Sequence, residues 1–173
     1  MPNYFDDYVN EFKSLGEVDF NRLYRAPVLI GLGIVGELME DGERGNAQTF
    51  LAALYDEDDD VKSLMRRVWP IVKGEYGPPV PWVRVGRVAN NDVVINDYSI
   101  SKHHCEFRRS EGMMAIVDLD SHNGIMVGGH HIPAQMPIEV QDEDELVFGR
   151  YKFEYLGAQT FLTRVKNVAL ADH

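Results

Sequence analysis

The residues that could carry chemistry lie in three short stretches of the second half of the chain: Gly86-Arg87, Ser101-Lys102-His103-His104 and Ser121-His122-Asn123-Gly124. Together they offer a guanidinium, hydroxyls, an ammonium group and a side-chain amide. A guanidinium is a rigid fork of N–H donors that stays protonated at any relevant pH, and an amide can donate and accept at once. Binding a phosphate group requires a fixed cation and several oriented neutral donors, so these residue types suit an anion site.

The histidines raise the alternative of a metal site, because five of the six lie between His103 and His131. Adjacent residues of a strand point to opposite faces of the sheet, so His103 and His104 cannot readily chelate one ion together. The same holds for His130 and His131 if that stretch is extended. No cysteine or carboxylate lies near them at a zinc-type spacing. We therefore expect no metal and no cofactor.

The single cysteine, Cys105, excludes an intramolecular disulfide and suits a reducing interior. Its neighbour His104 raises the alternative of a thiol nucleophile activated by a base. Strand alternation separates these two side chains, and Cys105 alternates with Phe107 as a core position would. We expect a core residue and no enzymatic activity here.

Short runs of β-type residues separate the three stretches, with turn residues between them at hairpin spacing, as expected of an antiparallel sandwich. These runs are Val93–Ile95, Cys105–Phe107, Ala115–Leu119 and Ile125–Val127. Tyr151, Phe153 and Tyr155 then alternate with Lys152 and Glu154, which indicates a strand with one buried and one wet face. The candidate site residues are thus expected in the loops of a β-sandwich.

Four motifs in this order resemble the forkhead-associated (FHA) domain family: GR at 86–87, NDVVIND at 91–97, SISKHH at 99–104 and DLDSHNG at 118–124. The family pattern is Gly-Arg, then Asn-Asp before an apolar strand, then Ser-x-x-His, then Asp-Leu-x-Ser-x-Asn-Gly. The resemblance covers residues about 83–156 and leaves everything before Pro78 outside. It implies an all-β, antiparallel FHA-type sandwich of about eleven strands.

The resemblance also implies a function, because FHA domains bind phosphothreonine peptides. Carried over to this chain, the residues that contact the phosphate are Arg87, Ser101 and Lys102. Asn123 is expected to hold the main chain of the bound peptide and so to fix its register. Thr is expected to be preferred over Ser, because in the family its methyl group fills a small apolar pocket.

The remaining positions of the pattern have supporting or less certain roles. His104 is expected to brace the binding loops from inside, and Gly86 and Gly124 to provide the turns. His122 stands where many family members have Thr or Ser, some of which also touch the phosphate. A neutral imidazole could donate one bond there, and a protonated one would add charge below about pH 6.5.

Composition limits the kinds of partner. The formal charge of the 173-residue chain is −11, and both halves are acidic. Nucleic-acid binding depends on many Lys and Arg contacts, so we expect no nucleic-acid partner. The most apolar run, Pro27–Leu38, is shorter than the roughly 20 residues that span a bilayer, and the N-terminus lacks the pattern of a signal peptide. We expect no membrane insertion and a cytoplasmic location.

The first part of the chain has helical rather than strand periodicity. Tyr4–Leu15 has the pattern of an amphipathic helix that stops at Gly16, and Phe20–Met39 is interpreted as a buried helix. Two further helices are expected, one from Asn46 to Tyr55 and one over residues 63–71. The prolines after Tyr76 end this pattern.

We therefore expect a helical domain over 1–76, a Pro-rich linker at 77–81, the FHA β-sandwich over 82–160 and a C-terminal tail at 161–173. The tail would hold a last helix or strand over 161–168 and fray after it. The predicted function is a non-enzymatic phosphothreonine reader that acts as a signalling adaptor downstream of a Ser/Thr kinase. The expected partner is a Thr-phosphorylated protein or peptide, which would be the kinase itself or one of its substrates.

Two rival hypotheses remain open at this point. One is a scaffold that uses the same fold, together with the helical domain, to bind a partner without phosphate. The other is an enzyme or regulator whose active part is the helical region. The helical region lacks Gly-rich phosphate loops, metal-ligand spacings and nucleophile-base pairs. Only an activity measured on the isolated first 76 residues would support this second hypothesis.

Overall fold

The structure is a computed structural model that describes residues 3–35 and 64–171. Its helices are α1 (Phe5–Leu15), α2 (Glu17–Leu23) and α5 (Ala158–Ala171). The strands before the second half of the chain are β1 (Val28–Ile34) and β2 (Val68–Pro70). The others are β3 (Val83–Gly86), β4 (Val93–Val94), β5 (Cys105–Ser110), β6 (Met113–Asp118), β7 (Ile125–Val127), β8 (His130–His131), β9 (Ile138–Val140), β10 (Glu145–Phe148) and β11 (Tyr151–Leu156).

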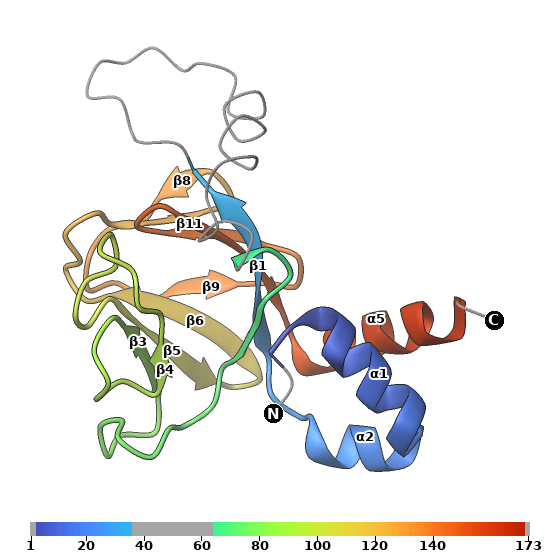
Figure 1. Ribbon diagram of the computed structural model, residues 1–173. Helices are drawn as coiled ribbons and strands as arrows, with labels where there is room; N and C mark the ends of the chain where they lie inside the picture. The colour runs from blue at the N-terminus through green and yellow to red at the C-terminus, as the bar shows by residue number, and fades with distance from the viewer. Residues whose placement is uncertain (1–2, 36–63, 172–173) are drawn as a thin grey trace.

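These strands form two sheets that pack face to face as a β-sandwich, seen in Figure 1. The larger sheet has the order β2-β1-β11-β10-β7-β8, and the smaller has the order β4-β3-β5-β6-β9. Neighbouring strands pair antiparallel, except β3 and β4, which pair parallel. The predicted antiparallel sandwich of about eleven strands is confirmed for the described residues.

The core between the sheets follows from the alternation seen in the sequence. Phe148 and Phe153 from the larger sheet meet Phe107 and Ile116 from the smaller one, and all four are buried. Cys105 is fully buried in the same core, which confirms its interpretation as a core residue, and burial raises the pKa of its thiol well above the usual value. The β runs predicted at Cys105–Phe107, Ile125–Val127 and Tyr151–Tyr155 are likewise confirmed.

The buried helix predicted over Phe20–Met39 is wrong for Val28–Ile34, which forms strand β1. This strand lies inside the larger sheet, between β2 and β11, and its residues are nearly all buried. A strand buried on both faces lacks alternation and cannot be told from a buried helix by periodicity. Gly31 allows the close approach, because a Cβ there would overlap the carbonyl oxygen of Leu64.

The helix predicted over residues 63–71 is also wrong where β2 forms, at Val68–Pro70. The segments predicted as helices around residues 36–39, 46–55 and 63 lie outside the described residues. Since β1 and β2 pair in one sheet with β11, a separate helical domain over 1–76 is only partly confirmed. Helices are present in this part of the chain, but two of its strands belong to the sandwich.

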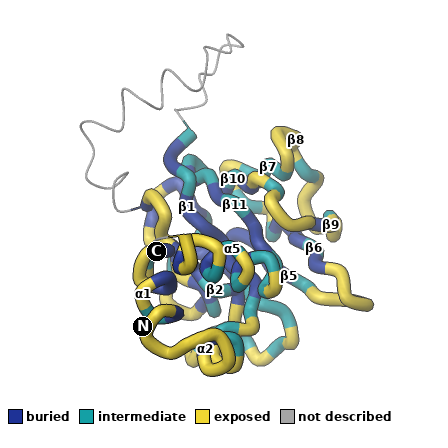
Figure 2. Tube along the Cα trace, turned by 90° about the vertical axis from the view of Figure 1, so that its right-hand side faces the viewer, coloured by how far each residue is buried: buried dark blue, intermediate teal, exposed yellow. Residues whose placement is uncertain are grey.

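The helices cover the outer face of the larger sheet. Phe161 of α5 packs edge-to-face on Phe5 and Tyr8 of α1, with ring centroids 6.1 and 5.1 Å apart. Val28 and Leu156 face this second cluster from β1 and β11. Figure 1 shows α1, α2 and α5 gathered on one side of the sandwich, and Figure 2 shows β1 as buried and most of α2 as exposed.

The last helix or strand expected over 161–168 is a helix, α5, which begins at Ala158 and continues to Ala171. Residues 169–171 were expected to fray, but Ala169 is 1% exposed because it packs in the helix cluster. Among the described residues, no helix is both long enough and apolar enough to cross a membrane.

Candidate functional site

The three predicted stretches lie in loops that adjacent strands bring together. Gly86-Arg87 ends β3, residues 99–104 lead directly into β5, and residues 119–124 join β6 to β7. Strand β5 pairs with both β3 and β6 in the smaller sheet. The pairing therefore places the end of β3, the start of β5 and the end of β6 side by side.

Hydrogen bonds tie the three loops to one another. The backbone N–H of Arg87 donates to the Ser101 carbonyl at 3.0 Å. The His122 N–H donates to the Ser101 Oγ at 3.0 Å, and the Asn123 side-chain amide donates to the Ser99 carbonyl at 2.8 Å. The structure thus brings Arg87, Ser101 and Asn123 to one end of the sandwich, as the sequence pattern predicts.

The buried ring of His104 braces these loops from inside. Its Nδ1 accepts the backbone N–H of Ser101 at 3.0 Å, and its Nε2 lies 3.2 Å from the Gly124 carbonyl. Because Nδ1 is an acceptor, the neutral ring carries its proton on Nε2 and donates it to Gly124. Burial lowers the pKa of His104, which favours this neutral form.

The two supporting glycines have separate reasons to be glycine. A Cβ at Gly86 would overlap the carbonyl oxygen of Lys102 and lie 2.7 Å from the side-chain nitrogen of Asn91. Gly124 has a φ of 71°, in the left-handed region that disfavours other residues. Both glycines therefore fix the separation and direction of the loops.

The side chains retain unused donors after these internal bonds. Arg87 donates its Nε–H to the Ile100 carbonyl at 3.1 Å, and it forms no ion pair with any described residue, so its terminal N–H groups remain available. The Ser101 hydroxyl accepts from His122 and keeps its own proton to donate. Asn123 keeps its carbonyl oxygen and a second N–H. The Arg87 guanidinium, the Ser101 hydroxyl and the Asn123 amide can therefore all donate hydrogen bonds to a ligand.

Lys102 and His122 are exposed at the same loops. The backbone of Lys102 is held by the buried Asn91, whose amide donates to its carbonyl at 2.7 Å. No described residue forms an ion pair with the Lys102 ammonium group, which can therefore move toward a bound anion. Asn91 belongs to the NDVVIND motif, but its contact with the Lys102 carbonyl was not predicted from the sequence.

A family model of the FHA domain matches residues 83–149, the part of the chain that holds all these loops. Residues 83–149 are an FHA domain. Such domains are binding modules rather than catalysts. The match ends at residue 149, between β10 and β11, and it leaves β1, β2, β11 and the helices outside.

Curated relatives match over the same part of the chain. The oxoglutarate dehydrogenase inhibitor of Corynebacterium glutamicum is 33% identical over 76 residues, which cover 44% of this chain and 51% of the inhibitor. The glycogen accumulation regulator GarA of Mycolicibacterium smegmatis is 28% identical over 76 residues, covering 44% of this chain and 46% of GarA. The chain thus spans about half the length of the curated relatives it matches.

Solved FHA domains are also similar to this structure. The solution structure of the FHA domain of an Arabidopsis thaliana hypothetical protein has 18% identity and a TM-score of 0.49, covering 79% of this chain and 88% of that one. An FHA domain solved in a study of phosphothreonine-dependent FHA domain interactions has 16% identity and a TM-score of 0.46, covering 76% of this chain and 95% of that one.

A buried ion pair that the sequence analysis missed supports the FHA loops. Arg150 contacts both carboxylate oxygens of Asp97, the shortest distance being 2.7 Å. Asp97 also accepts the backbone N–H and the hydroxyl of Ser99, at 2.9 and 2.6 Å. Burial raises the pKa of Asp97, but the hydrogen bonds from Arg150 and Ser99 outweigh it and hold that pKa below its usual value. The pair therefore fixes Ser99, whose carbonyl holds Asn123.

A second missed network anchors the Pro-rich segment to the FHA domain. Asp92 accepts the ammonium group of Lys73 at 2.8 Å and the backbone N–H groups of Gly74 and Arg84 at 2.9 and 2.8 Å. Lys73 also donates to the carbonyls of Pro78 and Trp82. The segment predicted as a linker at 77–81 is thus held against β3 and the loop before β4.

His104 makes the stability of the domain depend on pH. Its pKa is lowered in the folded state, so the unfolded chain binds more protons between that lowered value and the ordinary value of about 6.5. The free energy of unfolding is therefore expected to fall as the pH drops below about 6.5. Urea denaturation at pH 7.5 and 5.5 measures this. His103, whose pKa burial also lowers, contributes in the same direction.

The variant His104→Gln isolates the contribution of His104, because an amide can accept from Ser101 and donate to Gly124 without titrating. We expect it to lose less stability than the wild type between these two pH values. An equal loss in both proteins would show that His104 is not the titrating group.

Proposed function

We propose that this protein is a non-enzymatic reader of phosphothreonine that binds a Thr-phosphorylated protein through the loops at one end of its FHA domain. Arg87, Ser101 and Lys102 would contact the phosphate, His122 would contact it or the adjacent peptide, and Asn123 would hold the peptide main chain. The observation that carries this proposal is the Arg87 guanidinium, which forms no ion pair with any described residue and lies in the same loop cluster as the Ser101 hydroxyl and the Asn123 amide.

The charge at this site suits a doubly negative group. A phosphothreonine carries about −1.5 to −2 charges and three acceptor oxygens. Charge-assisted hydrogen bonds contribute roughly 1.5–3 kcal/mol each, so two or three would supply most of a micromolar affinity of about −8 kcal/mol. Because the chain has a formal charge of −11, an unpaired cation at these loops is a local exception to its overall field.

Similar proteins support a regulatory role. Two of the curated relatives are an inhibitor of oxoglutarate dehydrogenase and a regulator of glycogen accumulation. We propose that this chain likewise acts as a signalling adaptor, downstream of a Ser/Thr kinase, with the kinase or one of its substrates as partner. The proposed location is the cytoplasm, where the thiol of Cys105 would stay reduced.

A calorimetric titration with a degenerate peptide library in three forms tests this function. One residue at a fixed position is phosphothreonine in the first form, phosphoserine in the second and unmodified Thr in the third. The proposal predicts micromolar binding of the phosphothreonine form, weaker binding of the phosphoserine form and no measurable binding of the unmodified one. Equal binding of all three would favour a scaffold that binds without phosphate, for which the internally bonded loops are already ordered.

A further inference from the structure

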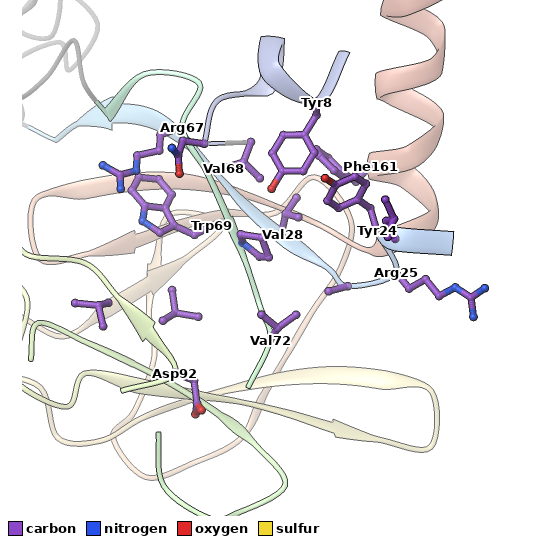
Figure 3. Close-up of a pocket in the computed structure, with 16 residues that line it drawn as sticks. Tyr8, Tyr24, Arg25, Val28, Arg67, Val68, Trp69, Val72, Asp92 and Phe161 are labelled. Carbon is purple, nitrogen blue, oxygen red and sulfur yellow. The ribbon is translucent and has the colours of Figure 1, made fainter. Parts of the chain in front are cut away.

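A cavity of about 360 Å³ lies away from the FHA loops, where the helices meet the edges of both sheets. It is lined by the end of α2, by β1 and β2 of the larger sheet and by β4 of the smaller one. Figure 3 shows Tyr8, Tyr24 and Phe161 on the helix side, with Trp69 and Arg67 opposite and Val28 between them. None of the proposed phosphopeptide-binding residues lines it.

The walls of this seam cavity, as we name it, are mainly apolar. Aromatic rings come from Tyr8, Tyr24, Trp69 and Phe161, and aliphatic side chains come from both sheets and from α2. Among the latter, Leu23, Val72 and Val94 are 61%, 45% and 40% exposed at the rim. Ligand sites are typically clefts of about 300–1,000 Å³ lined by apolar and aromatic groups with a few placed polar ones, so this cavity suits a small ligand.

One polar group of the helices faces the cavity. Tyr8 lines it from α1, and the residue is only 1% exposed. Figure 3 shows this hydroxyl directed from α1 toward the cavity. Burial, reinforced by the negative charges of Glu11 and Asp7, raises the pKa of Tyr8 to about 12, so the hydroxyl keeps its proton. A protonated phenol directed toward the cavity can donate a hydrogen bond to an acceptor on a ligand.

The charged side chains that line the cavity favour an anion at its Arg67 edge, opposite the helices. The charged residues in its lining are Arg25, Arg67 and Asp92. The Asp92 carboxylate is neutralised by Lys73 and two backbone N–H groups and points away from the cavity in Figure 3. The Arg67 guanidinium lies over the Trp69 ring, 5.2 Å from its centroid, and forms no ion pair with any described residue. A cation at one edge and a phenol donor inside therefore meet apolar walls.

From these features we propose that the seam cavity binds a small amphipathic carboxylate, whose apolar tail lies among Tyr24, Trp69 and Val28. Its carboxylate would accept hydrogen bonds from the Tyr8 hydroxyl or the Arg67 guanidinium. The volume, near the lower end of the range for ligand sites, favours a medium-chain fatty acid or an aromatic acid over a larger molecule. This site is independent of the proposed phosphopeptide site.

Isothermal titration of the full chain with decanoate tests the proposal, with decanol as the uncharged probe. We expect saturable binding of one decanoate per chain and binding of decanol at least tenfold weaker. Arg67→Gln is expected to weaken decanoate binding about tenfold, because it removes a charge-assisted contact. Tyr8→Phe, which removes only the hydroxyl, is expected to weaken it about threefold to tenfold.

Two further variants make the result specific to the cavity. Val72→Trp fills the rim and should reduce decanoate binding at least tenfold, whereas Arg109→Gln, which removes an exposed charge from β5, should leave it unchanged. Retained circular dichroism shows that each variant is folded. The proposal is overturned if decanoate binds without saturation, or if folded Arg67→Gln, Tyr8→Phe and Val72→Trp all bind it as the wild type does.

Discussion

Replacing Arg87 with Ala is expected to weaken the binding of a phosphothreonine peptide about a hundredfold. The variant removes the guanidinium whose terminal N–H groups are unpaired at the FHA loops. Two charge-assisted bonds at roughly 1.5 kcal/mol each correspond to about 3 kcal/mol, and each 1.4 kcal/mol is a factor of ten in affinity. Fluorescence anisotropy with a labelled phosphopeptide measures the dissociation constant.

Two control variants separate the roles of charge and geometry. Arg87→Lys keeps the charge but loses the planar fork and the bond to the Ile100 carbonyl, so about a tenfold loss is expected. Arg109→Ala removes an exposed Arg near the opposite end of β5 and should change the affinity less than twofold. An Arg87→Ala protein that binds the phosphopeptide as well as the Arg109→Ala protein does would contradict the proposed role of Arg87.

The second large effect is expected at Asp97, which is buried behind the FHA loops and is not one of the proposed phosphopeptide-binding residues. Its side chain is 4% exposed, and it binds Arg150, whose side chain is 21% exposed. Removing one partner of a buried ion pair costs about 3–5 kcal/mol because the other charge is left unpaired. Since Arg150 retains some solvent contact, we expect Asp97→Ala to lower the free energy of unfolding by about 3 kcal/mol, at the low end of that range. Denaturation with guanidinium chloride measures it.

The exposed pair between Glu145 and Lys152 supplies a matched control. Its side chains are 52% and 30% exposed, and exposed pairs contribute only about 0–1 kcal/mol. Glu145→Ala should therefore change stability by less than about 1 kcal/mol. Equal losses in the two variants would show that the Asp97–Arg150 pair does not support the domain. Because Asp97 fixes Ser99, which holds Asn123, phosphopeptide affinity should fall in Asp97→Ala but not in Glu145→Ala.

The position of the FHA loops could be predicted because a few residue types occur in a fixed order between the apolar segments that form the strands. Arg87, Ser101 and Asn123 each follow or precede an apolar run, and the pairing of β3, β5 and β6 brings them together. The role of His104 was also predictable, since the ring connects two loops that the same pattern contains. Whether these side chains bind phosphate stays a prediction.

The supporting residues were not predictable in the same way. Asp97 and Arg150 are 53 positions apart, and no local pattern indicates that two such residues will meet. Strand β1 was interpreted as a helix because burial on both faces removes the alternation on which the interpretation depends. The packing of α1 on α5 was not predicted either. Like the Asp97–Arg150 pair, it joins residues far apart in the sequence that only the tertiary fold brings together.

Backbone amide chemical shifts, recorded by NMR during titration with a phosphothreonine peptide, show which residues of the protein the peptide contacts. The largest shift changes are expected on residues 86–87, 99–104 and 121–124, and the unphosphorylated peptide is expected to cause none of them. Shift changes that do not depend on the phosphate, or that are centred on a different surface of the protein, would show that these loops do not bind phosphothreonine.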